Sequence, residues 1–151
     1  MTKKILFRAD GTAESGLGHL YRLFALVDIY KEQFDFVFLT KKSSVLSIIP
    51  RNYTLKIIPE EIDISEEPFW INKKFSHNEY IIISDGYQFT STYQKTIKEL
   101  GYFLIYIDDL AIEHMYADIV VNHSPNVNKK TFTSEPYTFF GLGADYAILR
   151  P

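Results

Sequence analysis

The sequence predicts an α/β fold in which helices cover both faces of a parallel sheet. Short apolar runs alternate with helix-length segments along the chain, which is the element order of doubly wound parallel sheets. Two of the runs, residues 81–83 and 104–107, are almost continuously apolar, as in strands that are buried on both faces. The chain has 151 residues, of which 46% are hydrophobic and 23% charged. We therefore expect a single domain, 1–151, built on one substantial core.

The predicted elements follow one another in a regular order. Strands are expected at residues 4–8, 34–39, 54–58, 80–84, 102–107, 118–122 and 137–140. Helices are expected at residues 19–31, 44–49, 65–75 and 92–100. The first helix has apolar or aromatic residues at helical spacing, at Leu20, Leu23, Phe24, Val27 and Tyr30. Ser65 is a possible cap for the third helix, and Gly101 is a stop signal after the fourth.

Composition and charge exclude several classes of protein. The net charge of −3 gives no general attraction to nucleic acid or to anionic membranes, so neither is expected as a partner. The absence of cysteine excludes a disulfide scaffold and a thiolate zinc site, and it fits a reducing cytoplasm. No apolar run approaches the roughly 20 residues of a membrane span, and the start of the chain leaves no room for a signal peptide. We expect a cytoplasmic protein.

The segment between the first predicted strand and the first predicted helix is the most informative part of the chain. It contains Gly11, Gly16 and Gly18 and leads directly into His19. A helix that opens on His19 places an imidazole beside unpaired backbone N–H groups, which attract anions and disfavour the imidazolium. A neutral imidazole can accept a proton, as a general base must. The alternative is an ordinary tight turn with His19 as a first-turn residue.

Two known phosphate-binding loops do not fit this segment. Gly11 and Gly16 have the glycine spacing of a P-loop, but Leu17 and Gly18 stand where Lys and Ser or Thr are required. A dinucleotide fingerprint starting at Gly16 would need a third glycine where Tyr21 stands. The loop therefore belongs to neither class.

Polar residues recur where the predicted strands end. They are Arg8 and Asp10, then residues of the segment 84–87, then Asp108 and Asp109, then residues 122–124. Because ligands of doubly wound sheets bind beyond the carboxyl ends of the strands, this recurrence favours a pocket at one sheet edge. Asp, Asn and Gly also form turns after any strand, and that alternative stays open for each residue taken singly.

No metal or other cofactor is expected. Asp108 and Asp109 resemble a metal-binding pair, but neighbouring residues on an extended strand point to opposite faces, and no third ligand is near in sequence. The acidic residues between 60 and 67 read as solvated charge around a helix start. His77 is expected in a polar turn, and His114 in a loop or short helix. His123 lies nearer the expected pocket.

Five blocks of sequence resemble one known family. They are residues 8–22, 85–87, 107–111, 118–122 and 143–151. In this order they resemble the UDP-sugar hydrolases of pseudaminic acid biosynthesis, which release UDP from UDP-2,4-diacetamido-2,4,6-trideoxy-altrose, and the related spore-coat polysaccharide proteins. The match covers nearly the whole chain. Family members can carry a histidine between the matching Asp and Tyr, where this chain has Gly86.

The resemblance implies an architecture and a set of roles. It implies the N-terminal half of a glycosyltransferase-B-type fold, whose nucleotide-binding C-terminal domain is not in this chain and would be its partner. His19 would be the general base that activates water, and Tyr87 would orient the sugar or the water. Substrate contacts would come from other residues of these blocks, namely Arg8, Asp10, Gly16, Gly18, Arg22, Asp85, Asp108 and Asn122.

Three functions follow as expectations. The first is an N-terminal domain of a nucleotide-sugar hydrolase that serves surface-glycan synthesis and has little or no activity alone. The second is a glycosyltransferase of the same fold, in which His19 deprotonates an acceptor hydroxyl. The third is a non-catalytic binding domain.

Overall fold

The chain folds around one seven-stranded parallel sheet. The computed structural model describes residues 2–148. The strand order is β3-β2-β1-β4-β5-β7-β9, and every neighbouring pair is parallel. The strands are β1 (Lys4–Ala9), β2 (Phe36–Lys41), β3 (Leu55–Ile58), β4 (Tyr80–Asp85), β5 (Leu104–Ile107), β7 (Ile119–Asn122) and β9 (Phe139–Leu142). Two short strands, β6 (His114–Met115) and β8 (Thr133–Ser134), pair with each other outside this sheet.

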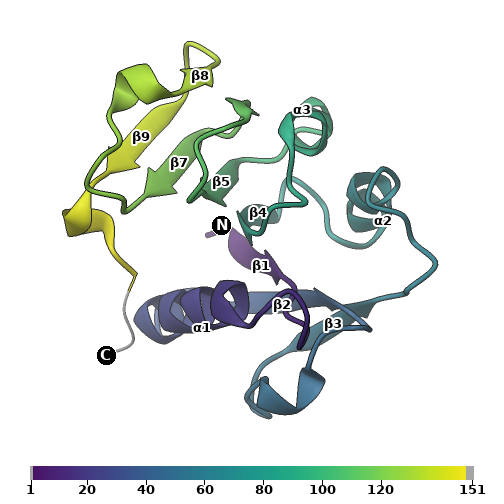
Figure 1. Ribbon diagram of the computed structural model, residues 1–151. Helices are drawn as coiled ribbons and strands as arrows, with labels where there is room; N and C mark the ends of the chain where they lie inside the picture. The colour runs from purple at the N-terminus through teal and green to yellow at the C-terminus, as the bar shows by residue number, and fades with distance from the viewer. Residues whose placement is uncertain (1, 149–151) are drawn as a thin grey trace.

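Helices cover both faces of the sheet, as Figure 1 shows. Helix α1 (Gly18–Tyr30) packs on one face with the short 3-10 helix η1 (Leu46–Ile48). Helices α2 (Glu67–Lys74) and α3 (Ser91–Glu99) pack on the other. Two further 3-10 turns, η2 (Lys129–Thr131) and η3 (Ala144–Tyr146), lie in the C-terminal third of the chain. The fold is a Rossmann-like doubly wound α/β fold, as predicted.

Alternation along the strands divides the core into two layers. In β1, Ile5, Phe7 and Ala9 face α1, whereas Leu6 and Arg8 face α2 and α3. Successive side chains of a strand point to opposite faces, so a strand buried on both sides must be apolar throughout. Within β1, Arg8 departs from this pattern, because it is charged and fully buried.

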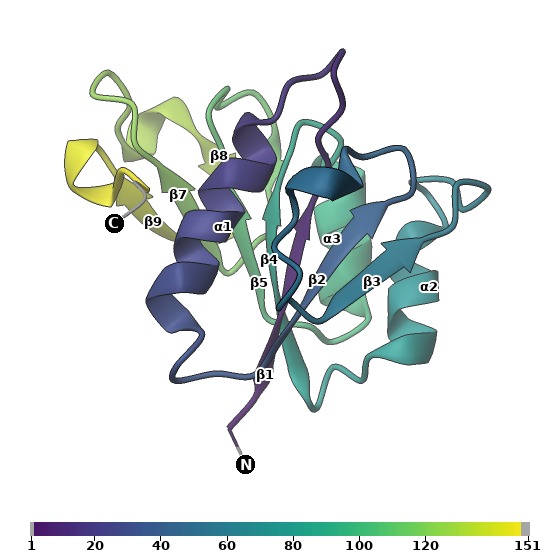
Figure 2. The ribbon, with the colours of Figure 1, turned by 90° about the horizontal axis from the view of Figure 1, so that it is seen from below.

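The strand order reverses between β1 and β4, and this decides where the site lies. From β1 the chain runs outward through β2 and β3 and then returns to place β4 on the other side of β1. Crevices form at the carboxyl edge of such a switch point because the connections leave it in opposite directions. In Figure 2 the loop after β1 leads into α1 at this edge.

All seven sheet strands and three of the four helices were predicted within a few residues. The segment 44–49 was predicted as a helix, but it forms only the 3-10 turn η1. His114 lies in strand β6 and not in a loop or helix. Ser65 does not cap α2: the N-cap residue is Glu66, without a side-chain cap bond, and Ser65 instead donates to the Asp63 carboxylate.

The end of α3 explains why β5 begins later than predicted. Gly101 does end the helix, since its N–H and that of Tyr102 donate back to the carbonyl oxygens of Lys98 and Ile97. These two residues are therefore committed to the helix cap, and the strand starts only at Leu104.

Candidate functional site

A pocket of about 410 Å³ opens at the switch point, on the α1 side of the sheet. Its lining comes from several connections. They supply Ser15 from the loop after β1, Gly18, His19 and Arg22 from the start of α1, Tyr87 from the loop after β4, Asp109 from the loop after β5 and His123 from the loop after β7. The structure thus brings His19 and Tyr87, the two predicted catalytic residues, into one pocket.

His19 and Asp85 form a hydrogen-bonded pair at the base of this pocket. Nδ1 of His19 lies 2.7 Å from Oδ1 of Asp85, whose side chain is fully buried at the end of β4. Nδ1 has two neighbours: the Asp85 carboxylate, which only accepts, at 2.7 Å, and Arg22 Nη2, which only donates, at 3.2 Å. We assign the proton to Nδ1 on the shorter contact, which leaves Nε2 of the neutral ring as an acceptor. The His19 side chain is 14% exposed and lines the pocket, so the ring is not enclosed in the hydrophobic core.

Arg22 completes the charge balance around Asp85. Its Nε donates to Oδ2 of Asp85 at 2.7 Å and its Nη2 to Oδ1 at 2.6 Å, a bidentate pair. Burial by itself would lower the pKa of Arg22, but the hydrogen bonds to Asp85 and the attraction of Asp85 and Asp109 outweigh it and raise that pKa. Asp85 is therefore an anchor for His19 and Arg22, one turn apart on α1.

Tyr87 reaches the pocket from the opposite wall. Its ring meets the His19 ring edge to face, with centroids 4.8 Å apart. Its hydroxyl donates to Oδ2 of Asp109 at 3.2 Å, and the side chain is 54% exposed. Partial burial and the nearby Asp109 carboxylate raise the pKa of Tyr87, so its hydroxyl remains a hydrogen-bond donor.

The loop before α1 is closed by its own side chains. Thr12 and Ser15 exchange backbone-to-hydroxyl bonds, and Gly16 N–H donates to the Thr12 carbonyl oxygen at 2.9 Å. Gly16 has a φ of +86°, a backbone angle that residues with a side chain rarely adopt. Gly18 needs no such angle, and a Cβ built on it would meet nothing within 4 Å. Helix α1 begins without a side-chain cap or an acidic residue in its first turn.

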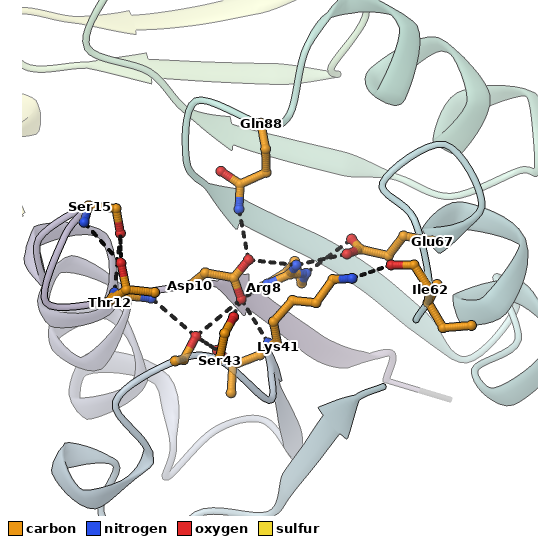
Figure 3. Close-up of polar contacts among 12 residues, drawn as sticks. Arg8, Asp10, Thr12, Ser15, Lys41, Ser43, Ile62, Glu67 and Gln88 are labelled. Carbon is orange, nitrogen blue, oxygen red and sulfur yellow. Dashed lines mark hydrogen bonds and ion pairs between the residues drawn. The ribbon is translucent and has the colours of Figure 1, made fainter. Parts of the chain in front are cut away.

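Arg8 and Asp10 lie elsewhere, on the α2 side of the sheet (Figure 3). Arg8 is fully buried between two carboxylates, donating to Asp10 through Nη1 and Nη2 and to Glu67 through Nε and Nη2. Tyr93 donates a hydrogen bond to Glu67 from α3. Burial alone would lower the pKa of Arg8, but the attraction of Glu67 and Asp10 raises it, so this network is held permanently charged at its centre.

Asp10 ties three loops of the carboxyl edge together. Besides Arg8, its carboxylate accepts from Lys41 N–H at 2.8 Å, from Thr40 Oγ1 at 3.1 Å and from Gln88 Nε2 at 3.0 Å. Asp10 borders a second cavity, of about 350 Å³, that does not include His19. The predicted substrate contacts of Arg8 and Asp10 stay predictions, and the geometry separates them from His19.

Asp108 and Asn122 are also buried, and they bond to each other. Asn122 Nδ2 donates to Oδ2 of Asp108 at 3.0 Å, and the same oxygen accepts from the Ala111 N–H at 2.8 Å. Burial raises the pKa of Asp108 against the opposing effect of these hydrogen bonds. Their predicted contact with substrate is untested, and in this arrangement they shape the loops behind the pocket.

Asp109 faces the pocket in place of Asp108, as the alternation of an extended strand requires. Its Oδ1 is buried and has no hydrogen-bond partner. Asp108 was the predicted substrate contact of this pair, and that contact stays a prediction; Asp109, which was not predicted as a site residue, is the one that lines this pocket. Glu67 and Gln88 were missed as well. Glu67 lies in an acidic run that looks solvated, and nothing in the local sequence of Gln88 points to Asp10.

The remaining histidines and acidic residues do not gather into a metal site. Among residues 2–148 there is no group of three or more His, Asp or Glu side chains placed to hold a metal ion. His77 packs near the Tyr102 ring, and His114 bonds to Glu135.

No protein-family model matches the chain. The chain is similar to uncharacterized protein MJ1062 of Methanocaldococcus jannaschii. The two are 33% identical over 163 residues, an alignment that covers 97% of this chain and 31% of that protein. The chain therefore spans less than a third of the length of this relative. In the described part of the chain, no helix has both the length and the apolar character needed to cross a bilayer.

Proposed function

We propose that this chain is the water-activating, N-terminal domain of a UDP-sugar hydrolase, and that His19 is its general base. The substrate class comes from the sequence resemblance, which implies a UDP-linked 2,4-diacetamido-2,4,6-trideoxyhexose. The observation that carries the proposal is the pairing of His19 with Asp85 in a pocket at the switch point.

The proposed reaction is a displacement at the anomeric carbon. Water attacks that carbon, and its proton passes to Nε2 of His19. The bond between the anomeric carbon and the diphosphate oxygen breaks, and UDP departs with the electron pair. The proton on Nδ1, held by Asp85, stabilises the imidazolium as it forms and fixes the ring plane.

The diphosphate leaving group needs little catalytic help from this domain. A diphosphate departs readily without a strong general acid, unlike the leaving group of an ordinary glycoside. The uncapped first turn of α1, with Gly18 and His19 at the pocket wall, offers N–H groups to an anion. We propose that the rest of the nucleotide contacts come from a C-terminal domain, and that the isolated chain turns over slowly or not at all.

The test is UDP release from the UDP-sugar, assayed with the protein in the full length that its gene encodes. His19→Asn should abolish release while UDP binding persists, and His77→Asn, outside the pocket, should leave release unchanged. Near-normal turnover of His19→Asn would remove the role given to His19. Formation of a new glycoside with added acceptors would assign the site to a glycosyltransferase instead, and no turnover of either kind would leave a binding domain.

A further inference from the structure

We infer that Gln88 is a positioning residue that fixes Tyr87 against His19 by its hydrogen bond to Asp10, and that Gly86 is what allows it to do so. The role of this contact in catalysis rests on the proposed function, but the positioning of Tyr87 can be tested without an activity assay. It links the two polar clusters on opposite faces of the sheet.

The segment 86–88 is held at both sides of Tyr87. Before it, the Gly86 carbonyl oxygen accepts a hydrogen bond from the Tyr106 hydroxyl at 3.1 Å. After it, Gln88 Nε2 donates to Oδ2 of Asp10 at 3.0 Å (Figure 3). Tyr87 itself is the most exposed member of the segment, and its hydroxyl bond to Asp109 lies at its far tip. The direction of the Tyr87 side chain is therefore set mainly by the flanking anchors.

Asp10 is a rigid anchor for Gln88. Its carboxylate is held by both terminal nitrogens of the fully buried Arg8, and Arg8 is held in turn by the fully buried Glu67 on α2. Attraction to Arg8 and the hydrogen bonds of the network outweigh the effect of burial and lower the pKa of Asp10, so the acceptor stays charged in the neutral range. A charged acceptor makes a stronger hydrogen bond to the Gln88 amide than a neutral one would.

Gly86 makes the space that Gln88 occupies. A Cβ on Gly86 would lie 2.3 Å from Oε1 and 2.9 Å from Cδ of Gln88, so the amide group folds directly under the Gly86 backbone. Any larger residue at position 86 must push this amide away. Since the clashing atoms belong to the end of a flexible side chain, the chain would accommodate the change by giving up the bond to Asp10.

The experiment measures the contact between Tyr87 and His19 in the 151-residue chain by NMR cross-peaks between their rings. In the parent chain the centroids are 4.8 Å apart, so cross-peaks are expected. Gln88→Ala should lose them while cross-peaks within the core remain. Gln33→Ala, an exposed glutamine beyond α1, is the matched control and should keep them.

Gly86→Ala and the double variant complete a double-mutant cycle. Gly86→Ala should lose the same cross-peaks. In free energy of unfolding, Gly86→Ala should cost more in the parent chain than in Gln88→Ala, because the clash disappears with the Gln88 side chain. Backbone strain at position 86 is present in both backgrounds and cancels in the comparison. Equal costs of Gly86→Ala in the two backgrounds would overturn the role of Gly86.

Retention of the ring contact in Gln88→Ala would overturn the role of Gln88. If a variant does not fold, Gln88→Asn, whose shorter side chain falls short of Asp10, provides the same test. Failure here leaves His19 as a candidate base, whereas a failed UDP-release assay leaves the positioning of Tyr87 intact, so the two proposals fail separately.

Discussion

Asp85, at the end of β4, holds His19 and Arg22 of α1 through one buried carboxylate. Oδ1 accepts from His19 at 2.7 Å and from Arg22 at 2.6 Å, and Oδ2 accepts from Arg22 at 2.7 Å. The first turns of α1 are thereby fastened to the strand beside β1. One side chain both selects the His19 tautomer and orients its ring.

Asp85→Asn should remove the preference of His19 for the tautomer with its proton on Nδ1. An amide can present either its oxygen or its NH2 group to Nδ1, so the strict preference for a proton on Nδ1 is lost. We expect nitrogen chemical shifts of His19 to move from a single Nδ1–H form toward a mixture at pH values where the ring is neutral. His77, in the same spectrum, is the internal control. Unchanged His19 shifts would show that Asp85 does not set the tautomer.

Asp109→Asn should lower the pKa of Tyr87. Partial burial and the Asp109 carboxylate hold that pKa above the ordinary 10.0, because an anionic phenolate beside a carboxylate is disfavoured. The folded pKa is raised for an acid, so the associated stability is present below pH 10.0 and is lost as pH rises through the folded pKa. A titration followed by tyrosine ring resonances measures the shift. A rise in the variant would contradict the assignment.

Glu67→Gln should destabilise the fold strongly. The substitution leaves the fully buried Arg8 with one charged partner and weakens the bond from Tyr93. Breaking a buried ion pair from one side costs about 3–5 kcal/mol. Urea unfolding measures the change in the free energy of unfolding. Glu66→Gln, the exposed neighbour, should change it by less than about 0.5 kcal/mol, and equal effects of the two variants would refute the importance of the network.

Asp10→Asn should make the free energy of unfolding depend less on pH in the acid range. The folded pKa of Asp10 is below its ordinary 3.8, mainly because attraction to Arg8 overcomes burial. The stability from its ionised form is therefore complete above pH 3.8 and is lost as pH falls through the folded pKa. We expect the parent chain to lose stability faster than Asp10→Asn on acidification. Parallel pH profiles would show that another carboxylate controls this range.

The two glycines at the start of α1 should respond oppositely to alanine. Gly16→Ala places a side chain at φ +86° and should cost about 1 kcal/mol of unfolding free energy, as a lower bound. Gly18 opens the helix with free space at its Cβ position, so Gly18→Ala should gain roughly 0.5–1 kcal/mol. Thermal or urea unfolding of the pair measures the contrast. A loss in both would mean that the space beside Gly18 is not free.

The sequence predicted the sheet because the pattern that defines it is local. The runs around residues 81–83 and 104–107 are apolar on both faces, and that alone requires cover from two layers of helices. The helix stop at Gly101 is likewise a property of one residue's backbone. The prediction of a pocket at the carboxyl edge of the sheet is also confirmed, since the carboxyl ends of parallel strands must share an edge.

Only the tertiary structure decided which polar residues meet. Arg8 and His19 stand on either side of the same loop, between β1 and α1. Strand alternation directs the Arg8 side chain to the α2 side of the sheet, whereas the turn at Gly16 leads the chain to His19 on the α1 side. Pairings such as His19 with Asp85, or Gln88 with Asp10, join segments that are distant in sequence. Local patterns determine where strands and helices form, but which side chains share a charge or a proton depends on the packing of the whole sheet.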